Sequence, residues 1–311
     1  MTRLALASIL TITALGAPPA AAQTVVDKGP VEAIASGALR TVWAVTVTKA
    51  TADAPGTSML RTLDESGAPV DLVIAPVQSL VNLTIGHGPG GNATAVYGGC
   101  RPDCGFFAYD LEARRERELT IPLGPDNCAN IAPRYDSGRV YFVRVGPRRC
   151  RPGLYELRGR RSIRRLAASD LATLSLDGGR IAYARLNPRD DQEAQVVLHR
   201  LGARRGRVVY RDSSPGSGCD VSLRPTVTGL RLLVGVQTAC EGGRSAMVVR
   251  IDARRRALRC SSLSLPADEA ERVLDFAFPT PRLLYRRERA NERSAELVAV
   301  DAPAFGAARS C

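Results

Sequence analysis

Short runs in which apolar and polar residues alternate recur along the chain from residue 31 to residue 305. An alternation with a period of two residues is typical of strands that bury one face. Several pairs of these runs flank a short polar turn that contains two adjacent arginines. Two strands around a tight polar turn predict a β-hairpin. The turns of the four hairpins of this kind carry Arg114-Arg115, Arg160-Arg161, Arg204-Arg205 and Arg254-Arg255.

A second hairpin precedes most of these arginine turns. The segments YDSGRVYFVR (135–144), SLDGGRIAYAR (175–185) and TVTGLRLLVGV (226–236) each contain a short strand, a turn with glycine and a strongly apolar strand. GGNATAVYGG (90–99) is a weaker version. The repeating unit therefore has four strands, and its arginine turns recur at steps of 46, 44 and 50 residues. Four strands in about 45 residues are typical of a β-propeller blade.

Extending this register in both directions predicts an all-β, six-bladed β-propeller. The sixth unit lacks a fourth strand, and the N-terminal segment TVVDKG (24–29) would supply it and close the ring. Closure removes the exposed sheet edge, which otherwise favours aggregation. A pair of β-sandwich sheets would explain the alternation but not the regular arginine turns. The expected blades cover about 31–78, 79–123, 124–169, 170–214, 215–266 and 267–305.

The units with SLDGGRIAYAR and YDSGRVYFVR resemble the repeats of TolB-type, WD40-like six-bladed propellers. The likeness covers about residues 30–305, and the third and fourth units carry it best. Most units lack the Ser-Pro-Asp-Gly form of the repeat, and the chain has no counterpart of the separate N-terminal domain of TolB. The resemblance therefore implies a fold and does not identify a partner.

The first 22 residues have the pattern of a secretory signal peptide. Arg3 precedes an apolar run from Leu4 to Leu15, and Ala20-Ala21-Ala22 offers a small-residue cleavage site. The apolar run is too short to cross a bilayer as a helix, and no later stretch is apolar for 18 residues. We therefore expect a single propeller domain, 23–311, that is secreted or held in the cell envelope.

An exported chain with eight cysteines predicts four disulfides. A zinc site is the alternative, because three residues separate Cys100 from Cys104, but only two histidines are present. Eight cysteines allow 105 pairings, and the repeat register favours one of them because it places loops of one unit at the same end of the sheet. The expected pairs are Cys100–Cys104, Cys128–Cys150, Cys219–Cys240 and, by elimination, Cys260–Cys311.

The net charge is +12, and nearly all of the positive charge comes from arginine. Guanidinium groups bind carboxylates and phosphates through two parallel hydrogen bonds. The arginine turns would form a basic arc on the face opposite the disulfides, where an anionic envelope polymer would dock. Charged turns that only protect the sheet edges are the preferred interpretation, and the docking arc is the alternative. Nucleic acid is not expected, because aromatic residues make up 5% of the chain and stacking surfaces are scarce.

Catalytic motifs are few. No G-x-S-x-G, P-loop or H-E-x-x-H segment occurs, and the two histidines, His87 and His199, fall in different parts of the predicted unit. His87 lies in GHGPGG, which forms either a tight hairpin or an anion-binding nest of backbone N–H groups. No cofactor and no metal are expected. The acidic segment NPRDDQE, with Asp190, Asp191 and Glu193, is interpreted as a solvated loop in preference to a calcium site.

Asp126, Asp170 and Asp220 precede the innermost strands of three consecutive units. Their carboxylates would meet near the axis if the register holds. The missing motifs and the disulfide-stapled loops together predict a non-enzymatic, monomeric binding propeller that uses the stapled face to bind an unknown protein or an anionic polymer. The alternative is a hydrolase or lyase with a carboxylate site at the central channel.

Overall fold

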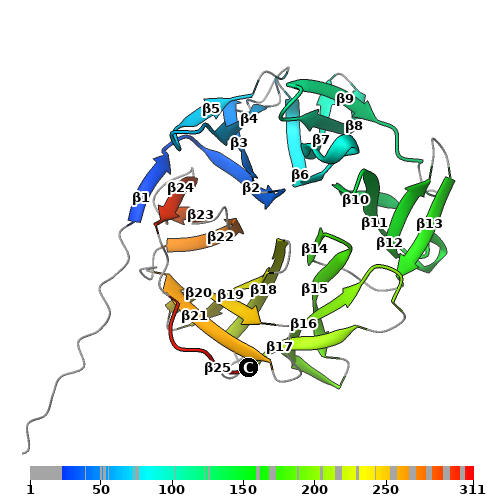
Figure 1. Ribbon diagram of the computed structural model, residues 1–311. Helices are drawn as coiled ribbons and strands as arrows, with labels where there is room; N and C mark the ends of the chain where they lie inside the picture. Colours follow the sequence, from blue (N-terminus) through cyan, green and yellow to red (C-terminus); the bar gives the residue numbers. More distant parts are fainter. Residues whose placement is uncertain are drawn as a thin grey trace, which may run out of the picture.

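The chain is built almost entirely of antiparallel strands arranged in a ring (Figure 1). The computed structural model describes residues 23–311 except 39, 50, 52–53, 55, 73, 75–76, 102, 123, 125–126, 159–161, 168–172, 188, 204–205, 214–218, 229–230, 242, 253–257, 266–270, 278–281, 290–294 and 302–304. Within these residues the only helical segments are two 3-10 turns, η1 (Pro89–Gly91) and η2 (Arg148–Cys150). In the same part of the chain, no helix has the length and apolar character needed to cross a bilayer.

Two four-stranded sheets follow the order of the chain strand by strand. The first contains β10 (Ala129–Asp136), β11 (Arg139–Val145), β12 (Gly153–Arg158) and β13 (Ser162–Ala167). The second contains β14 (Thr173–Asp177), β15 (Arg180–Asn187), β16 (Asp190–Arg200) and β17 (Arg207–Ser213). Each neighbouring pair is antiparallel, as the predicted hairpins require.

A third sheet has the same order and one added strand. It contains β18 (Cys219–Thr228), β19 (Arg231–Cys240), β20 (Gly243–Asp252) and β21 (Arg259–Leu265), and the short β25 (Arg309–Ser310) pairs with β21. The C-terminal tail is thereby attached to the outer edge of this sheet.

The N-terminal third of the ring is one eight-stranded sheet. Its strands are β2 (Val31–Gly37), β3 (Arg40–Thr48), β4 (Thr57–Leu63), β5 (Pro69–Asp71), β6 (Val77–His87), β7 (Ala93–Arg101), β8 (Asp103–Asp110) and β9 (Arg115–Leu119). The groups β2–β5 and β6–β9 are joined only by a short β4–β6 pairing at Thr57–Gln78 and Ser58–Val77. Each group has the strand content of one predicted unit.

The last sheet combines the first strand of the chain with three strands from its C-terminal part. It contains β22 (Glu271–Ala277), β23 (Leu283–Arg289) and β24 (Ala295–Val300), and β1 (Gln23–Asp27) pairs antiparallel with β24. In Figure 1, β1 lies beside β24, while β2, β6, β10, β14, β18 and β22 lie innermost in their sheets. A ring of radially arranged four-stranded sheets is the architecture of a β-propeller.

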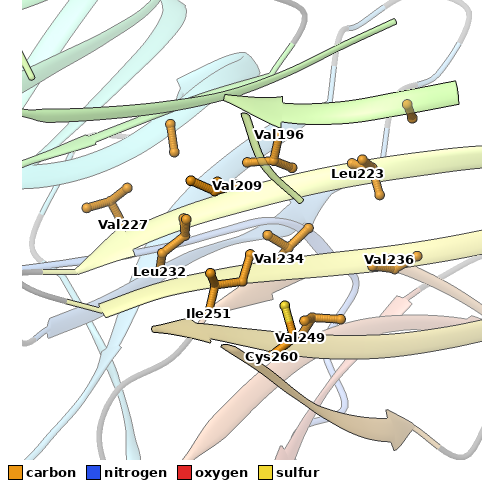
Figure 2. Packing of buried hydrophobic residues seen from close by; sticks show 12 residues of the cluster. Val196, Val209, Leu223, Val227, Leu232, Val234, Val236, Val249, Ile251 and Cys260 are labelled. Atoms are coloured by element: carbon orange, nitrogen blue, oxygen red, sulfur yellow. The ribbon is translucent and has the colours of Figure 1, made fainter. Parts of the chain in front are cut away.

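The core lies between neighbouring sheets, because each strand turns its apolar face toward the next sheet. Figure 2 shows one such layer, in which Val196 and Val209 of one sheet pack against Leu223, Val234 and Val249 of the next. These side chains are almost completely buried, and each contributes about 1.5–3 kcal/mol by leaving water. The alternation seen in the sequence therefore produces the sheet-to-sheet packing.

Glycine allows the innermost strands to approach one another closely. A Cβ atom on Gly86 of β6 would lie 1.9 Å from the carbonyl oxygen of Tyr135 in β10, and one on Gly37 would lie 2.5 Å from that of Ile85. Neither contact is compatible with a side chain. The hydroxyl of Thr84 donates to the carbonyl of Pro133 in the same region. β6 and β10 therefore run side by side in the same direction.

Four disulfides are present, and they join the predicted pairs Cys100–Cys104, Cys128–Cys150, Cys219–Cys240 and Cys260–Cys311. Four disulfides in one chain indicate an oxidising compartment outside the cytoplasm. The last of them fixes the C-terminal residue to β21, next to β25.

A buried carboxylate links the N-terminal strand to the neighbouring sheet. Asp27 of β1 accepts hydrogen bonds from Trp43 Nε1 at 2.8 Å and from Arg61 Nη1 at 3.0 Å, and its other oxygen accepts one from Gly29 N. Trp43 is fully buried. Burial opposes ionisation of Asp27, but the hydrogen bonds from Gly29, Trp43 and Arg61 outweigh it and hold the pKa of this carboxyl below its ordinary value.

Candidate active site at the inner-strand turns

Three polar residues occupy the last position of three consecutive innermost strands. His87 ends β6, Asp136 ends β10 and Asp177 ends β14. The two aspartates are each followed by a two-residue turn, Ser137-Gly138 and Gly178-Gly179, in which both residues have positive φ angles. Such turns match the twist of antiparallel strands. They bring the last strand residues to the same end of the ring.

Asp136 fastens one sheet to the next. Its side chain is buried, and its two oxygens accept hydrogen bonds from the backbone N–H groups of Gly178 at 2.7 Å and Gly179 at 3.0 Å. Charge-assisted hydrogen bonds of this kind are stronger than neutral ones. Asp136 therefore holds the β14–β15 turn, and with it Asp177, in a fixed position.

His87 reaches Asp177 across the intervening sheet. The distance from His87 Nε2 to Asp177 Oδ1 is 3.9 Å, and the two residues belong to sheets separated by the sheet β10–β13. The His87 side chain is 43% exposed, whereas that of Asp177 is 7% exposed. Gly138 N donates to the His87 carbonyl at 3.0 Å, which fixes the backbone of His87 against the β10–β11 turn.

The other imidazole nitrogen is also positioned. His87 Nδ1 lies 3.2 Å from the carbonyl oxygen of Gly91 in η1, so this nitrogen is the donor in the neutral ring. Nε2 is then the nitrogen that accepts a proton. A separation of 3.9 Å from Asp177 is longer than a direct hydrogen bond and allows a water molecule or substrate hydroxyl to contact both groups. A solvent-exposed imidazole beside a buried carboxylate is suited to general acid–base chemistry.

Two hollows lie next to the β8–β9 hairpin, and the lining of neither includes His87, Asp136 or Asp177. One, of about 380 Å³, is lined by Pro89 of η1 and by Arg115 and Arg117 of β9. The second, of about 580 Å³, lies between the β2–β5 and β6–β9 groups and is lined in part by Arg114. Arg114 and Arg115 form the one predicted arginine turn within the described residues, and both are exposed. Arg160, Arg161, Arg204, Arg205, Arg254 and Arg255 lie outside the described residues.

The three aspartates expected near the axis are only partly described. Asp126 and Asp170 lie outside the described residues, and Asp220 is exposed at the start of β18. Val227, near the end of β18, donates its N–H to Ser175 Oγ, near the end of β14. Asp220 is seven residues earlier in its strand, about 23 Å from that end. It does not join the His87–Asp177 cluster.

The acidic segment NPRDDQE does not form the expected loop. β16 begins at Asp190, so Asp190, Asp191 and Glu193 lie in a strand. The strand is longer than predicted because its first residues pair with both neighbours, as at Asn187–Asp190 and Glu193–Ser213. Glu193 accepts hydrogen bonds from three side chains, among them Arg211 at 2.8 Å. Among the residues described, no group of three His, Cys, Asp or Glu side chains could hold a metal ion.

His199 lies elsewhere, on β16. It packs edge-on against Tyr183, and burial lowers the pKa of its imidazole. The sequence candidates include neither Asp136 nor Asp177. The signal for both was present, because an aspartate precedes the glycine turn in YDSG and in LDGG.

No protein-family model and no curated protein matches this sequence. Among solved structures, the chain is similar to a puromycin-hydrolyzing peptidase of Mycobacterium tuberculosis, with 14% identity over 90% of this chain and 52% of that one and a TM-score of 0.51. A puromycin hydrolase matches with 12% identity, 92% and 54% coverage and a TM-score of 0.50. The chain thus spans about half the length of these two proteins. At these identities, the likeness shows the fold.

These structures correct one sequence-based expectation. The chain was expected to be a non-enzymatic binding module that uses its stapled loops, whereas both similar structures are of hydrolases. The expectation of a protein without enzymatic activity is therefore wrong on this comparison. Of the two functions that the sequence suggested, these comparisons favour the hydrolase over the binding module.

Proposed function

We propose that the chain is a hydrolase whose His87 and Asp177 activate a water molecule at the inner-strand turns. The observation that carries this proposal is the 3.9 Å approach of the exposed His87 Nε2 to the buried Asp177 carboxylate. The two similar structures, a puromycin-hydrolyzing peptidase and a puromycin hydrolase, favour an amide bond as the target.

The proposed reaction uses each group in one role. A water molecule donates a hydrogen bond to His87 Nε2, and its oxygen attacks the amide carbonyl carbon while Nε2 takes its proton. The imidazolium then gives this proton to the leaving nitrogen as the carbon–nitrogen bond breaks, which restores the neutral ring. Asp177 stabilises the imidazolium by its negative charge. Asp136 acts as a positioning residue, because it holds the turn that carries Asp177.

The direct test is hydrolysis of puromycin and, in parallel, of the dipeptide Ala-Ala by the purified, oxidised chain, followed by mass spectrometry of the products. His87→Gln and Asp177→Asn are expected to lower the rate by roughly 10²- to 10⁴-fold, the range for loss of general acid–base catalysis. His199→Gln is the matched control, since it replaces the other histidine, which lies on β16. Absence of hydrolysis of both substrates by the wild-type chain, or equal rates in all three variants, would contradict the proposal.

We also propose the finer architecture that the repeat predicts: six blades in one domain, with β1 as the closing strand beside β24. The pairing of β1 with β24 and the six groups of four strands support it. The TolB-type and WD40-like character of the repeats belongs to the same proposal. It is supported by the aspartate–glycine turns at Asp136 and Asp177, each of which joins an innermost strand to its neighbour.

Export as a monomer and contact with an anionic envelope polymer remain proposals as well. The signal-like segment 1–22 and the four disulfides support export. The exposed Arg114 and Arg115 support the contact with a polyanion, which would weaken as salt screens the charges. Retention of the protein on an acidic polymer at both low and high salt would contradict an electrostatic contact.

A further inference from the structure

Arg134 lies two residues before Asp136 on the innermost strand β10. Its side chain points toward the sheet β14–β17, as the alternation of the strand and two contacts indicate. Side chains two residues apart on a strand share a face, and the carboxylate of Asp136 reaches the β14–β15 turn. Tyr141, directly opposite Arg134 in register, packs against Leu176 of β14.

A bulge produces this orientation. The β10–β11 register shifts between Ile131 and Arg134, and Ala132 within the shift has a φ of 47°. Ala132 adopts a left-handed conformation that is unfavourable for a residue with a Cβ atom. Bulges re-aim side chains and are common beside active sites. Here the bulge lets Ile131, three residues before Arg134, lie on the same face as Arg134. Asp136, about 7 Å further along the strand, shares that face by the ordinary alternation.

Among the described residues, no carboxylate is paired with the guanidinium of Arg134. Its Nε is buried without a hydrogen-bond partner in the described part of the chain. Burial lowers the pKa of the group from its ordinary value to about 10, and no carboxylate contributes to the shift. Three other partly buried arginines are paired with carboxylates, Arg61 with Asp27, Arg101 with Glu116 and Arg287 with Glu296. The buried Arg144 bonds the neutral oxygens of Asn130 and Pro122.

An unpaired cation inside a fold destabilises it, so a function for this charge is a more economical explanation than a structural role. The residue as a whole is partly accessible, although its Nε is buried. Its remaining N–H donors have the planar fork geometry that matches a carboxylate. Arg134 lies on β10 two residues before Asp136, which holds the turn that follows Asp177.

We propose that Arg134 binds a carboxylate of the substrate and so selects amides that carry a free acid near the bond to be cleaved. This inference rests on the proposed hydrolase function, because it names the substrate class of the same site. Arg134 would hold the substrate acid while His87 and Asp177 act on the neighbouring amide. Phosphate is also an anion that accepts hydrogen bonds from a guanidinium, and the competition experiment distinguishes phosphate from a carboxylate.

The test measures binding separately from hydrolysis. Calorimetric titrations use the full oxidised chain carrying His87→Gln, with the dipeptide Ala-Ala as the free acid and as the C-terminal amide. The free acid is expected to bind more tightly than the amide. Adding Arg134→Gln is expected to weaken binding of the acid by roughly 10- to 100-fold and leave binding of the amide unchanged. Arg134→Lys is expected to restore part of the preference, because it keeps the charge without the fork.

Arg165→Gln is the matched control, since Arg165 is an arginine of the same sheet that bonds the carbonyl of Pro152. It is expected to leave the preference for the acid intact. Equal binding of acid and amide by the parent protein, or an unchanged preference in Arg134→Gln, would overturn the proposal. Competition by inorganic phosphate but not by acetate would reassign the site to phosphate and overturn the carboxylate assignment.

Thermal unfolding supplies the second measurement. Removing an uncompensated buried charge is expected to raise the melting temperature of Arg134→Gln or leave it unchanged. A clear fall would show that Arg134 stabilises the fold, and the proposal would be abandoned. Failure of the hydrolase proposal is seen separately, as puromycin hydrolysis that does not depend on His87. The two hypotheses are therefore distinguishable.

Discussion

Replacement of Asp27 by Asn tests how the N-terminal strand is held. The substitution removes the charge that accepts hydrogen bonds from Trp43 Nε1 and Arg61 Nη1 and keeps the size of the side chain. A hydrogen bond to a charged group contributes about 1.5–3 kcal/mol. Arg61 is 28% exposed, which weakens its share, and Asn can still accept one bond. We therefore expect a loss of about 2–3 kcal/mol in the free energy of unfolding.

The loss depends on pH in a defined way. The folded-state pKa of Asp27 is lowered from its ordinary value of 3.8, so the ionised group stabilises the fold above that value. This contribution disappears as the pH falls through the lower folded-state pKa. The difference between the wild-type protein and Asp27→Asn is therefore expected to be largest near neutral pH and to vanish in strong acid.

The assay is urea unfolding followed by the fluorescence of Trp43, which is the only tryptophan in the chain. Asp71→Asn is the matched control, because Asp71 binds the same arginine but is 54% exposed. Its loss is expected to cost less than about 1 kcal/mol. Equal destabilisation by both variants, or a difference for Asp27→Asn that is the same at pH 2 as at pH 7, would refute the reasoning.

Two further predictions concern packing and disulfides. Gly86→Ala is expected to cost at least about 3 kcal/mol, because its Cβ would meet the Tyr135 carbonyl at 1.9 Å. Thermal unfolding measures both this variant and the control Gly202→Ala. A Cβ atom at position 202 has no other atom within 4 Å, so the control should cost only the strain of its positive φ. Removal of Cys260–Cys311, which closes 51 residues, is expected to cost about 4 kcal/mol, against about 2 for the four-residue Cys100–Cys104 loop. Equal midpoints for the two disulfide variants in urea would contradict the chain-entropy explanation.

Much of the fold follows from local patterns. In YDSGRVYFVR, apolar alternation on both sides of a Ser-Gly turn is sufficient to predict the β10–β11 hairpin, and Asp136 does pair with Arg139 across it. The cysteine pairs follow from the same register. Cys128 precedes β10 and Cys150 follows β11, so both lie at the same end of one hairpin.

The candidate site depends on contacts between sheets, which local patterns do not specify. His87 and Asp177 are 90 residues apart, and they meet because glycine at position 86 lets β6 approach β10 closely. The Asp136 and Asp177 motifs are identifiable in the sequence, but there they indicate only turns. The non-enzymatic expectation was wrong because it relied on missing local motifs, whereas residues far apart in the sequence can also form a hydrolytic site.

The pairing of β1 with β24 has a consequence for the order of assembly. Residues 23–27 have no strand partner until residues 295–300 have been synthesised. The two strands that make this contact are separated by nearly the whole chain, and contacts of such high sequence separation form slowly. The first strand therefore stays unpaired until the last sheet forms, and an unpaired strand is prone to associate with other chains. The pairing of β1 with β24 is thus a late step of folding, which requires both ends of the strand array in the same compartment.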